Sequence, residues 1–378
     1  MKDYLIYTTN NLNRENLHGG PRRLMEIVKG LADKGSNVTL VAADVPDKIK
    51  YDKNINFIKM TIKKSNLLPH EVAMFIGNVK LLFKLKKRQF DSIIVFDVPQ
   101  AIHLSLLNFK NINLFLRQDL IEYRRIVGEN ENRNIFTLNL YLLVLRTIES
   151  LCFLKANRII VQCEHDLISI CKRHSLIRKE IKKKTKILIN NINTSWNTKE
   201  FFEEDTRIID GKIKIAFIGN FSDERKGQSL VIPAMMNLLR KGYNFEFNVV
   251  GAGKHLERYK KLSKNYPQIN YLGFQSSVKD IICDSDFTIV PSLIDSCPNT
   301  VLESLYYEVP VYATNTGGIP DILVENEYMF EPNQNSLEEK IQDVLDNKKY
   351  LSDKFRQKTI AKRLNFDWVS EVEKIISS

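Results

Sequence analysis

The chain has 378 residues, a length that favours two or three domains of roughly 150 residues over a single one. Its composition, 43% hydrophobic and 27% charged, is that of a globular protein and excludes a disordered or fibrous chain. A formal net charge of +11 indicates an anionic partner, which could be nucleic acid, anionic lipid or a phosphorylated small molecule.

The first half of the chain alternates short apolar runs with amphipathic helical patterns, which predicts parallel strands connected by helices. Each run is almost continuously apolar, as in a strand that is buried on both faces. The first run lacks the features of a secretory signal, so we expect a cytoplasmic protein. The expected strands are 4–8, 37–42, 55–60, 92–96, 113–116, 158–161 and 185–189, and the expected helices include 22–34, 71–87 and 166–173.

Two apolar segments bear on membrane contact. Residues 71–88 carry apolar side chains along one side and lysines toward the end, which suits either an anionic lipid surface or, as we favour, a helix packed on its sheet. Residues 135–154 contain Asn139, Arg146 and Glu149, and because no uncharged run reaches about 18 residues we expect no membrane crossing there.

Residues 194–211 lose the periodicity and end in a turn signal, which predicts a domain boundary. A second series follows, with strands expected at 213–218, 245–250, 269–272, 287–290 and 309–313 and helices at 228–240, 255–264, 278–283, 299–307 and 337–345. We therefore predict an α/β fold of two Rossmann-like, doubly wound parallel-sheet domains that face a central cleft, at residues 1–195 and 212–360. Residues 361–378 would form a C-terminal helix that packs back on the first domain.

A polar cluster follows the strand at 287–290. Asp295 lies in the loop, and Glu303 follows eight residues later in a helix expected to begin near Pro298. A diphosphate can bind at the positive end of such a helix, through the amides of Asn299, Thr300 and Val301. Two acids at a loop and a helix could also be solvated surface, but the nearby Gly317 and Gly318 favour a site.

Three further positions at strand ends are candidates. Arg225 and Lys226 could stabilise the charge on a departing diphosphate, although Arg225 could equally be a solvated surface charge. Gly19-Gly20 suits either a close backbone approach to a phosphate or sugar, or an ordinary loop. Gln118 can form hydrogen bonds but cannot transfer a proton.

Metal, dinucleotide and nucleic-acid sites are not expected. Asp284-Ser285-Asp286 is an acidic pair that could hold a metal, but its place between a helix and a strand favours a structural turn. Gly251-Ala252-Gly253 lacks the third glycine and distal acid of an NAD site, so no cofactor is expected. The basic runs lack interleaved aromatic residues, which disfavours nucleic acid. The five cysteines are odd in number and widely scattered, which predicts reduced thiols.

Together these motifs resemble the retaining family 4 glycosyltransferases of the glycosyltransferase-B fold. Asp295 and Glu303 match the two acids of the E-x7-E signature, and residues 317–321 match the G-G-x-P-E loop that follows it. Lys226-Gly227 also fits the family pattern. The sequence departs from it at Asp295, which replaces Glu, at Gln118, which replaces His, and at Asn220, which replaces Arg.

The resemblance implies a metal-independent hexosyltransferase that moves a sugar from a nucleoside-diphosphate sugar, UDP in preference to GDP, to an acceptor hydroxyl with retention. It implies that Asp295 binds donor sugar hydroxyls and Glu303 the ribose. The implied catalytic residues are Lys226, Arg225, Asp295 and Gln118, and the implied donor-binding residues are Glu303, Asn299, Thr300, Val301, Gly19, Gly20, Gly317 and Gly318.

The positive charge favours work on a glycan or lipid-linked acceptor in surface polysaccharide or other glycan assembly, with a peripheral contact to the anionic inner face of the cell membrane. Two alternatives stay open, a non-catalytic subunit that binds nucleotide sugar and a nucleotide-sugar epimerase of the same fold.

Overall fold

The computed structural model describes residues 1–13, 19–61, 70–130, 134–192 and 212–377. The chain divides into two compact units, and each is described by itself. The first unit combines Met1–Leu188 with Asp367–Ser378, and the second is Ile189–Phe366.

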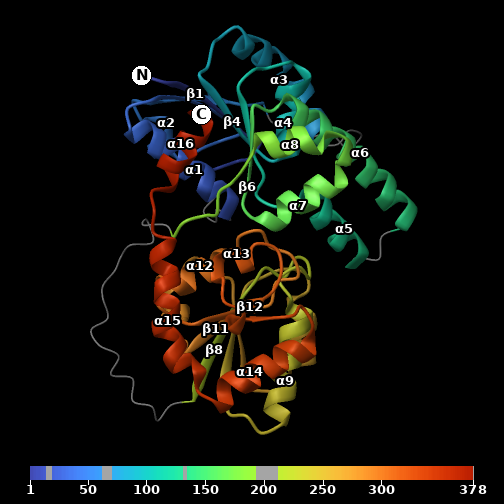
Figure 1. The fold of residues 1–378 in the computed structure, drawn as a ribbon, viewed down its shortest axis with the longest axis vertical. Helices are drawn as coiled ribbons and strands as arrows, with labels where there is room; N and C mark the ends of the chain where they lie inside the picture. The colour runs from blue at the N-terminus through green and yellow to red at the C-terminus, as the bar shows by residue number, and fades with distance from the viewer. Residues whose placement is uncertain (14–18, 62–69, 131–133, 193–211, 378) are drawn as a thin grey trace. The chain divides into compact units, whose positions relative to one another are not determined.

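The first unit is built on a parallel sheet of seven strands in the order β3-β2-β1-β4-β5-β6-β7 (Figure 1). Its central strand β4 (Ser92–Phe96) is buried at every position, as the continuous apolar run predicts. The other strands are β1 (Asp3–Tyr7), β2 (Asn37–Ala42), β3 (Ile55–Lys59), β5 (Ile112–Phe115), β6 (Arg158–Val161) and β7 (Thr185–Ile187). The helices are α1 (Gly19–Asp33), α2 (Asp47–Lys50), α3 (His70–Lys86), α4 (Val98–Leu106), α5 (Leu120–Asn130), α6 (Ile135–Lys155), α7 (Glu164–Arg173) and α8 (Arg178–Lys184), with a 3₁₀ turn η1 (Ser175–Ile177).

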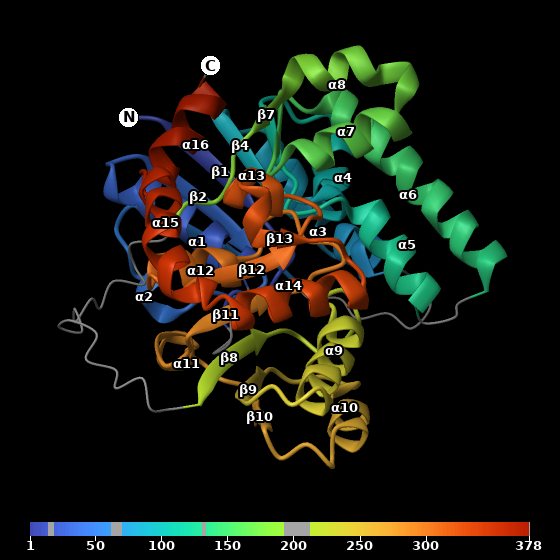
Figure 2. The same cartoon turned by 60° about the horizontal axis from the view of Figure 1, so that its bottom comes forward.

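The second unit has a parallel sheet of six strands in the order β10-β9-β8-β11-β12-β13. Helices α9 (Gln228–Arg240) and α14 (Gln334–Asp346) lie side by side against it, joined by a hydrogen bond of 2.7 Å from Asn237 to Glu338 (Figure 2). The strands are β8 (Ile213–Ile218), β9 (Phe245–Val250), β10 (Ile269–Gly273), β11 (Phe287–Val290), β12 (Val311–Thr314) and β13 (Met329–Phe330). The remaining helices are α10 (Leu256–Leu262), α11 (Lys279–Cys283), α12 (Asn299–Tyr306), α13 (Ile319–Leu323) and α15 (Lys349–Arg363), and a 3₁₀ turn η3 spans Asn326–Tyr328.

The end of the chain packs on the first unit. Helix α16 (Trp368–Ser377) lies against α1. The hydroxyl of Tyr4 on β1 also donates to Glu373 of α16 at 3.1 Å. Asp367 accepts from Lys34 at 3.1 Å, and hydrogen bonds from Ser370 lower the pKa of Asp367 to about 2. The first unit therefore resumes at Asp367, whereas residues 361–366, which the sequence assigned to a C-terminal helix, belong to the second unit.

The expected elements differ from the observed ones in a few places. Gly19 and Gly20 are the first two residues of α1 instead of lying before it, and Pro298 precedes α12 instead of opening it. Helix α15 and the two-residue strand β13 were not expected, because their polar or short sequences carry little periodicity.

Gly227 is a position where only glycine fits. Its φ is +77°, and a Cβ there would lie 1.8 Å from the carbonyl oxygen of Pro291, so Gly227→Ala should cost about 3 kcal/mol or more of unfolding free energy. The matched control is Gly242→Ala, with φ of +95° and no atom within 4 Å of the added Cβ, which should cost about 1–2 kcal/mol. Denaturant unfolding of both variants checks this, and equal losses would contradict it.

Candidate active site

Three loops of the second unit meet at the carboxyl ends of neighbouring strands. Strand β11 pairs with β8 on one side and with β12 on the other, so the loop after β11 lies between the loops after β8 and β12. The amide of Leu293 donates to the carbonyl of Arg225 at 2.8 Å, and the amide of Gly318 donates to the carbonyl of Asp295 at 3.0 Å. The sheet order thus brings together candidates that are far apart in the sequence.

Lys226 and Asp295 form an ion pair at the centre of this arrangement. The Lys226 ammonium lies 2.5 Å from a carboxylate oxygen of Asp295, and both side chains are more than four-fifths buried. The backbone of Gly317 packs closely against Asp295 from the other side, since a Cβ on Gly317 would lie only 2.1 Å from the Asp295 carbonyl oxygen. A cation expected to face a diphosphate therefore already has an acidic partner that fixes its position.

Helix α12 begins next to this ion pair. The hydroxyls of Ser304 and Thr288 lie 2.8 Å apart, which pins α12 to β11. Of the three amides expected to be available, that of Val301 donates to the carbonyl of Pro298 at 3.1 Å and is thereby occupied. Across the described residues, no backbone carbonyl accepts from the amides of Asn299 and Thr300, so these two could meet an anion.

Glu303 lies in the middle of α12 and is half-buried. Burial, together with the negative charge of Glu303, raises the pKa of Tyr307 to about 12. The carboxylate of Glu303 therefore lies in a partly desolvated place where a polar ligand group would gain from it.

The side chains of Arg225 and Asn220 form contacts within the loop after β8 that carries them. The guanidinium of Arg225 lies 3.4 Å from Asp223, whose carboxylate also accepts from the Arg225 amide at 3.1 Å. The side chain of Asn220 accepts from the amide of Ser222 at 2.7 Å. Arg225 could therefore contact a ligand only while sharing its charge with Asp223.

The first unit holds the other candidates, Gly19, Gly20 and Gln118. Gln118 is half-buried just after β5, between two anchored residues. Arg117 on one side is bound to Asp97, at the end of the neighbouring strand β4, through its backbone amide at 3.2 Å and its Nε at 2.7 Å. Asp119, on the other side of Gln118, is buried in a polar network. The backbone at Gln118 is thus held in place by the anchored residues before and after it.

Sequence reasoning missed this buried network. Arg173 on α7 donates to Asp119 at 2.9 Å and to Glu149 on α6 at 3.1 Å, and the ring of His174 lies 2.6 Å from Glu149. The available signal was Glu149 itself, because an acid within an apolar segment needs a buried partner. Burial alone would raise the pKa of Asp119, but Arg173 and the Ser169 hydroxyl hold that pKa below its ordinary value of 3.8.

The acidic pair at 284–286 lies at the other end of β11 from Asp295. Asp284 pairs with Lys214 at 2.9 Å, and the carboxylate of Asp286 accepts from the Lys214 amide at 2.7 Å. These contacts fit a structural turn that joins the starts of β11 and β8. Among the described residues no three His, Cys, Asp or Glu side chains gather as a metal site would need, and the five cysteines, all of them in described parts of the chain, form no disulfide.

Comparison with known proteins finds a family model and partial relatives for this chain. Residues 198–362 match the family model "Glycosyl transferases group 1". Protein CapJ of Staphylococcus aureus is 32% identical over 130 residues, which cover 33% of this chain and 33% of CapJ. The first curated relatives are matched over only 23 to 34% of their own length.

Two solved structures resemble the whole chain. WaaG, a glycosyltransferase involved in lipopolysaccharide biosynthesis, matches with a TM-score of 0.71 at 15% identity, covering 99% of this chain and 98% of WaaG. Anabaena HepE in complex with UDP-glucose matches with a TM-score of 0.70 at 14% identity, covering 99% and 98%. The glycosyltransferase-B fold predicted from the sequence is confirmed, and the residues that match the family model lie within the second unit.

Replacing Arg173 tests the buried network. Arg173→Gln would leave Asp119 and Glu149 as buried acids without their cation, at a cost of about 3–5 kcal/mol near neutral pH. The exposed Arg125, which pairs with Glu122, is the control, and Arg125→Gln should change stability by less than about 0.5–1 kcal/mol.

The loss should also depend on pH. In the wild type, Asp119 has a lowered pKa, so its contribution is present above the ordinary value of 3.8 and is lost as the pH falls through the folded value. Without Arg173, burial raises the pKa of the carboxyl, so the variant's deficit should shrink between pH 7 and pH 4. Urea titrations across this range measure the deficit, and a deficit that stays constant with pH would contradict the network.

Proposed function

We propose that this protein is a retaining, metal-independent glycosyltransferase that moves a hexosyl group from a nucleoside-diphosphate sugar to an acceptor hydroxyl. The single observation that carries the proposal is the largely buried Lys226–Asp295 ion pair beside the start of α12 and the Gly317-Gly318 loop. A cation and two available amides suit a diphosphate, and a carboxylate suits sugar hydroxyls. The group 1 family match over the same unit supports this interpretation.

The chemistry follows from where charge develops. The bond between the anomeric carbon and the diphosphate oxygen breaks, and negative charge grows on the leaving diphosphate, where Lys226 and the α12 amides would stabilise it. A bond forms between the acceptor oxygen and the anomeric carbon. The acceptor proton passes to the departing phosphate oxygen, since Gln118 at the expected proton-transfer position cannot accept it as a base.

Asp295 has two roles in this proposal. It holds the Lys226 ammonium in place before the donor binds, and its other carboxylate oxygen, which accepts from the Cys297 amide at 3.3 Å, would also accept from sugar hydroxyls. Because aspartate is one methylene shorter than the family's glutamate, the ion pair sets how far that carboxylate reaches. Glu303 would bind the ribose, with the pyrimidine nucleotide UDP preferred over GDP. HepE, whose structure contains UDP-glucose, supports that preference.

The proposed role is surface polysaccharide or other glycan assembly at the cytoplasmic side of the membrane, with a glycan or lipid-linked acceptor. The net charge of +11 favours anionic substrates and surfaces, and WaaG offers a lipopolysaccharide enzyme of the same fold. No cofactor beyond the nucleotide sugar is part of the proposal.

Turnover of Lys226→Ala tests the leaving-group role. Loss of a cation that acts mainly in the transition state should reduce turnover by about a hundredfold, roughly 3 kcal/mol, while donor affinity falls less. The readout is UDP release from UDP-hexoses with excess chelator present, and Lys241→Ala, at an exposed lysine of the same unit, is the control. Donor binding without any release of UDP by the wild type would favour the non-catalytic subunit, and dependence on added metal would refute metal independence.

Nucleotide affinity of Glu303→Ala tests the ribose contact. If Glu303 accepts hydrogen bonds from the ribose, its loss should weaken UDP binding by about 1.5–3 kcal/mol in calorimetric titration. The matched control is Glu308→Ala. Glu308 lies just after the same helix and pairs with Lys358. Unchanged affinity in a folded Glu303 variant would remove this residue from the site.

A further inference from the structure

Helix α6 of the first unit leaves one long apolar face unpacked. Its inner side buries Leu138, Glu149, Cys152 and Phe153. On the outer side Phe136 is 77% exposed and Leu143 is 58% exposed, and the intervals along this side follow the three- and four-residue spacing of a single helix face. The residues along this outer face are Phe136, Leu140, Leu143, Val144, Thr147, Leu151 and Leu154, none of them charged.

By length and composition alone this 21-residue helix could cross a membrane, although the polar residues within it predicted no crossing. Only 22% of the most apolar 18-residue stretch of this helix is buried. A crossing would nevertheless pull Glu149 away from Arg173 and His174, whereas contact along the membrane plane leaves that network intact. The packing therefore suits a helix that lies on a surface.

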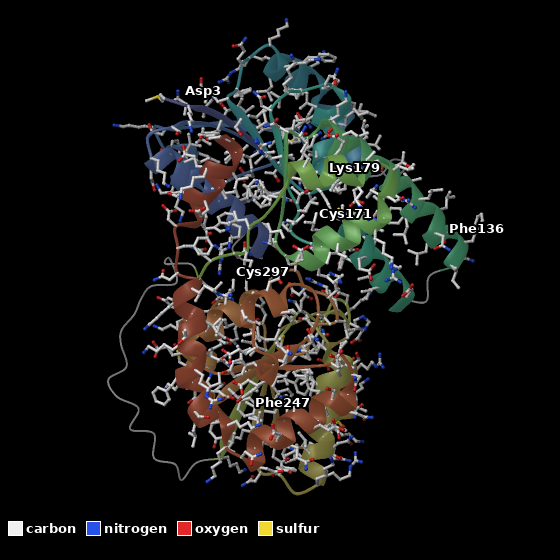
Figure 3. All side chains as sticks on the ribbon, in the orientation of Figure 1. Asp3, Phe136, Cys171, Lys179, Phe247 and Cys297 are labelled. Atoms are coloured by element: carbon white, nitrogen blue, oxygen red, sulfur yellow. The ribbon has the colours of Figure 1, made fainter. Side chains whose placement is uncertain are left out.

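A basic segment borders the C-terminal end of α6. Lys184 on α8 donates to the carbonyl of Leu154 at 2.8 Å, which places α8 beside that end. Figure 3 shows Lys179 on α8 and Phe136 at the opposite, outer end of α6. Leu176, at the turn before α8, is 99% exposed. The exposed charged residues from α7 to α8 are the cations Lys172, Arg178, Lys179, Lys182 and Lys183 and the acids Glu164 and Glu180.

We propose that the outer face of α6 and the basic residues of α8 together dock on an anionic lipid bilayer. The apolar face would enter the boundary between headgroups and acyl chains, and the lysines would meet the negatively charged headgroups. A second copy of this chain would cover the apolar face of α6, but the outer face that it brings carries no acid to meet the lysines of α8. This names the surface for the membrane contact proposed above, but it does not depend on glycosyl transfer.

Helix α3 is the rival surface, since the sequence first suggested lipid contact there. In the structure, only some of the residues on the expected apolar side of this helix are exposed. Leu82 is buried, whereas Val72, Ile76 and Phe83 are exposed, with exposed lysines at 80 and 84 beside them. These three exposed apolar residues offer less apolar surface than the outer face of α6 does.

Vesicle co-sedimentation of the full chain, without nucleotide, tests the proposal. The wild type should bind vesicles of phosphatidylcholine and phosphatidylglycerol (1:1) and bind phosphatidylcholine alone much more weakly. Two variants, Phe136→Gln/Leu140→Gln/Leu143→Gln and Lys179→Gln/Lys182→Gln/Lys183→Gln, should each lower partitioning into anionic vesicles by at least about tenfold.

Two control variants locate the surface. Leu351→Gln/Phe355→Gln removes exposed apolar residues of α15, and Ile76→Gln/Phe83→Gln does so on α3; neither should change binding. Loss of binding in the α3 variant alone would overturn the proposal, as would wild-type protein that ignores anionic vesicles or that forms a dimer abolished by the α6 substitutions. An unchanged circular dichroism spectrum and an unchanged thermal midpoint show that each variant folds. Neither measurement needs nucleotide, so a negative result here is distinct from failure of the proposed activity.

Discussion

The close approach of two backbone loops in the second unit is the constraint on which the candidate site depends. The loop after β8 can contact the loop after β11 only because Gly227 adopts a left-handed conformation and has no Cβ to strike Pro291. This approach brings Lys226 within 2.5 Å of Asp295. Gly317 allows the same closeness between the loop after β12 and Asp295, so both neighbouring loops approach the loop after β11 through a glycine. The positions of Lys226 and Asp295 thus depend on the two glycines, Gly227 and Gly317, that allow these loops to approach each other.

The buried ion pair also explains how a cation can be ready for a ligand that has not yet bound. An isolated lysine in a partly buried place would pay for its desolvation, whereas Asp295 compensates the charge and holds it in place. A diphosphate that arrives at the start of α12 would then meet a preorganised ammonium and two amides. The first unit uses the same principle, since Arg173 joins two buried acids and fixes the backbone next to Gln118.

The sequence predicted the parallel-sheet fold well, because apolar strands such as β4, β8 and β9 have the period and length that a doubly wound fold requires. It also predicted the loops that carry Asp295, Lys226 and Gly317. It could not predict that Lys226 pairs with Asp295, because that contact follows from strand order and not from spacing along the chain. The occupied amide of Val301 and the exposed face of α6 likewise depend on helix starts and packing partners that one sequence does not reveal.

The claim that a diphosphate binds between Lys226 and the start of α12 is tested most directly by comparing UDP with UMP in calorimetric titrations of the wild type and of Lys226→Ala. In the wild type, removal of the β-phosphate should weaken binding at least about tenfold, because it removes a charged hydrogen bond. In Lys226→Ala the ratio of the two affinities should be clearly smaller, because only the α12 amides still meet the β-phosphate. The same UDP-to-UMP ratio in both proteins would contradict the claim.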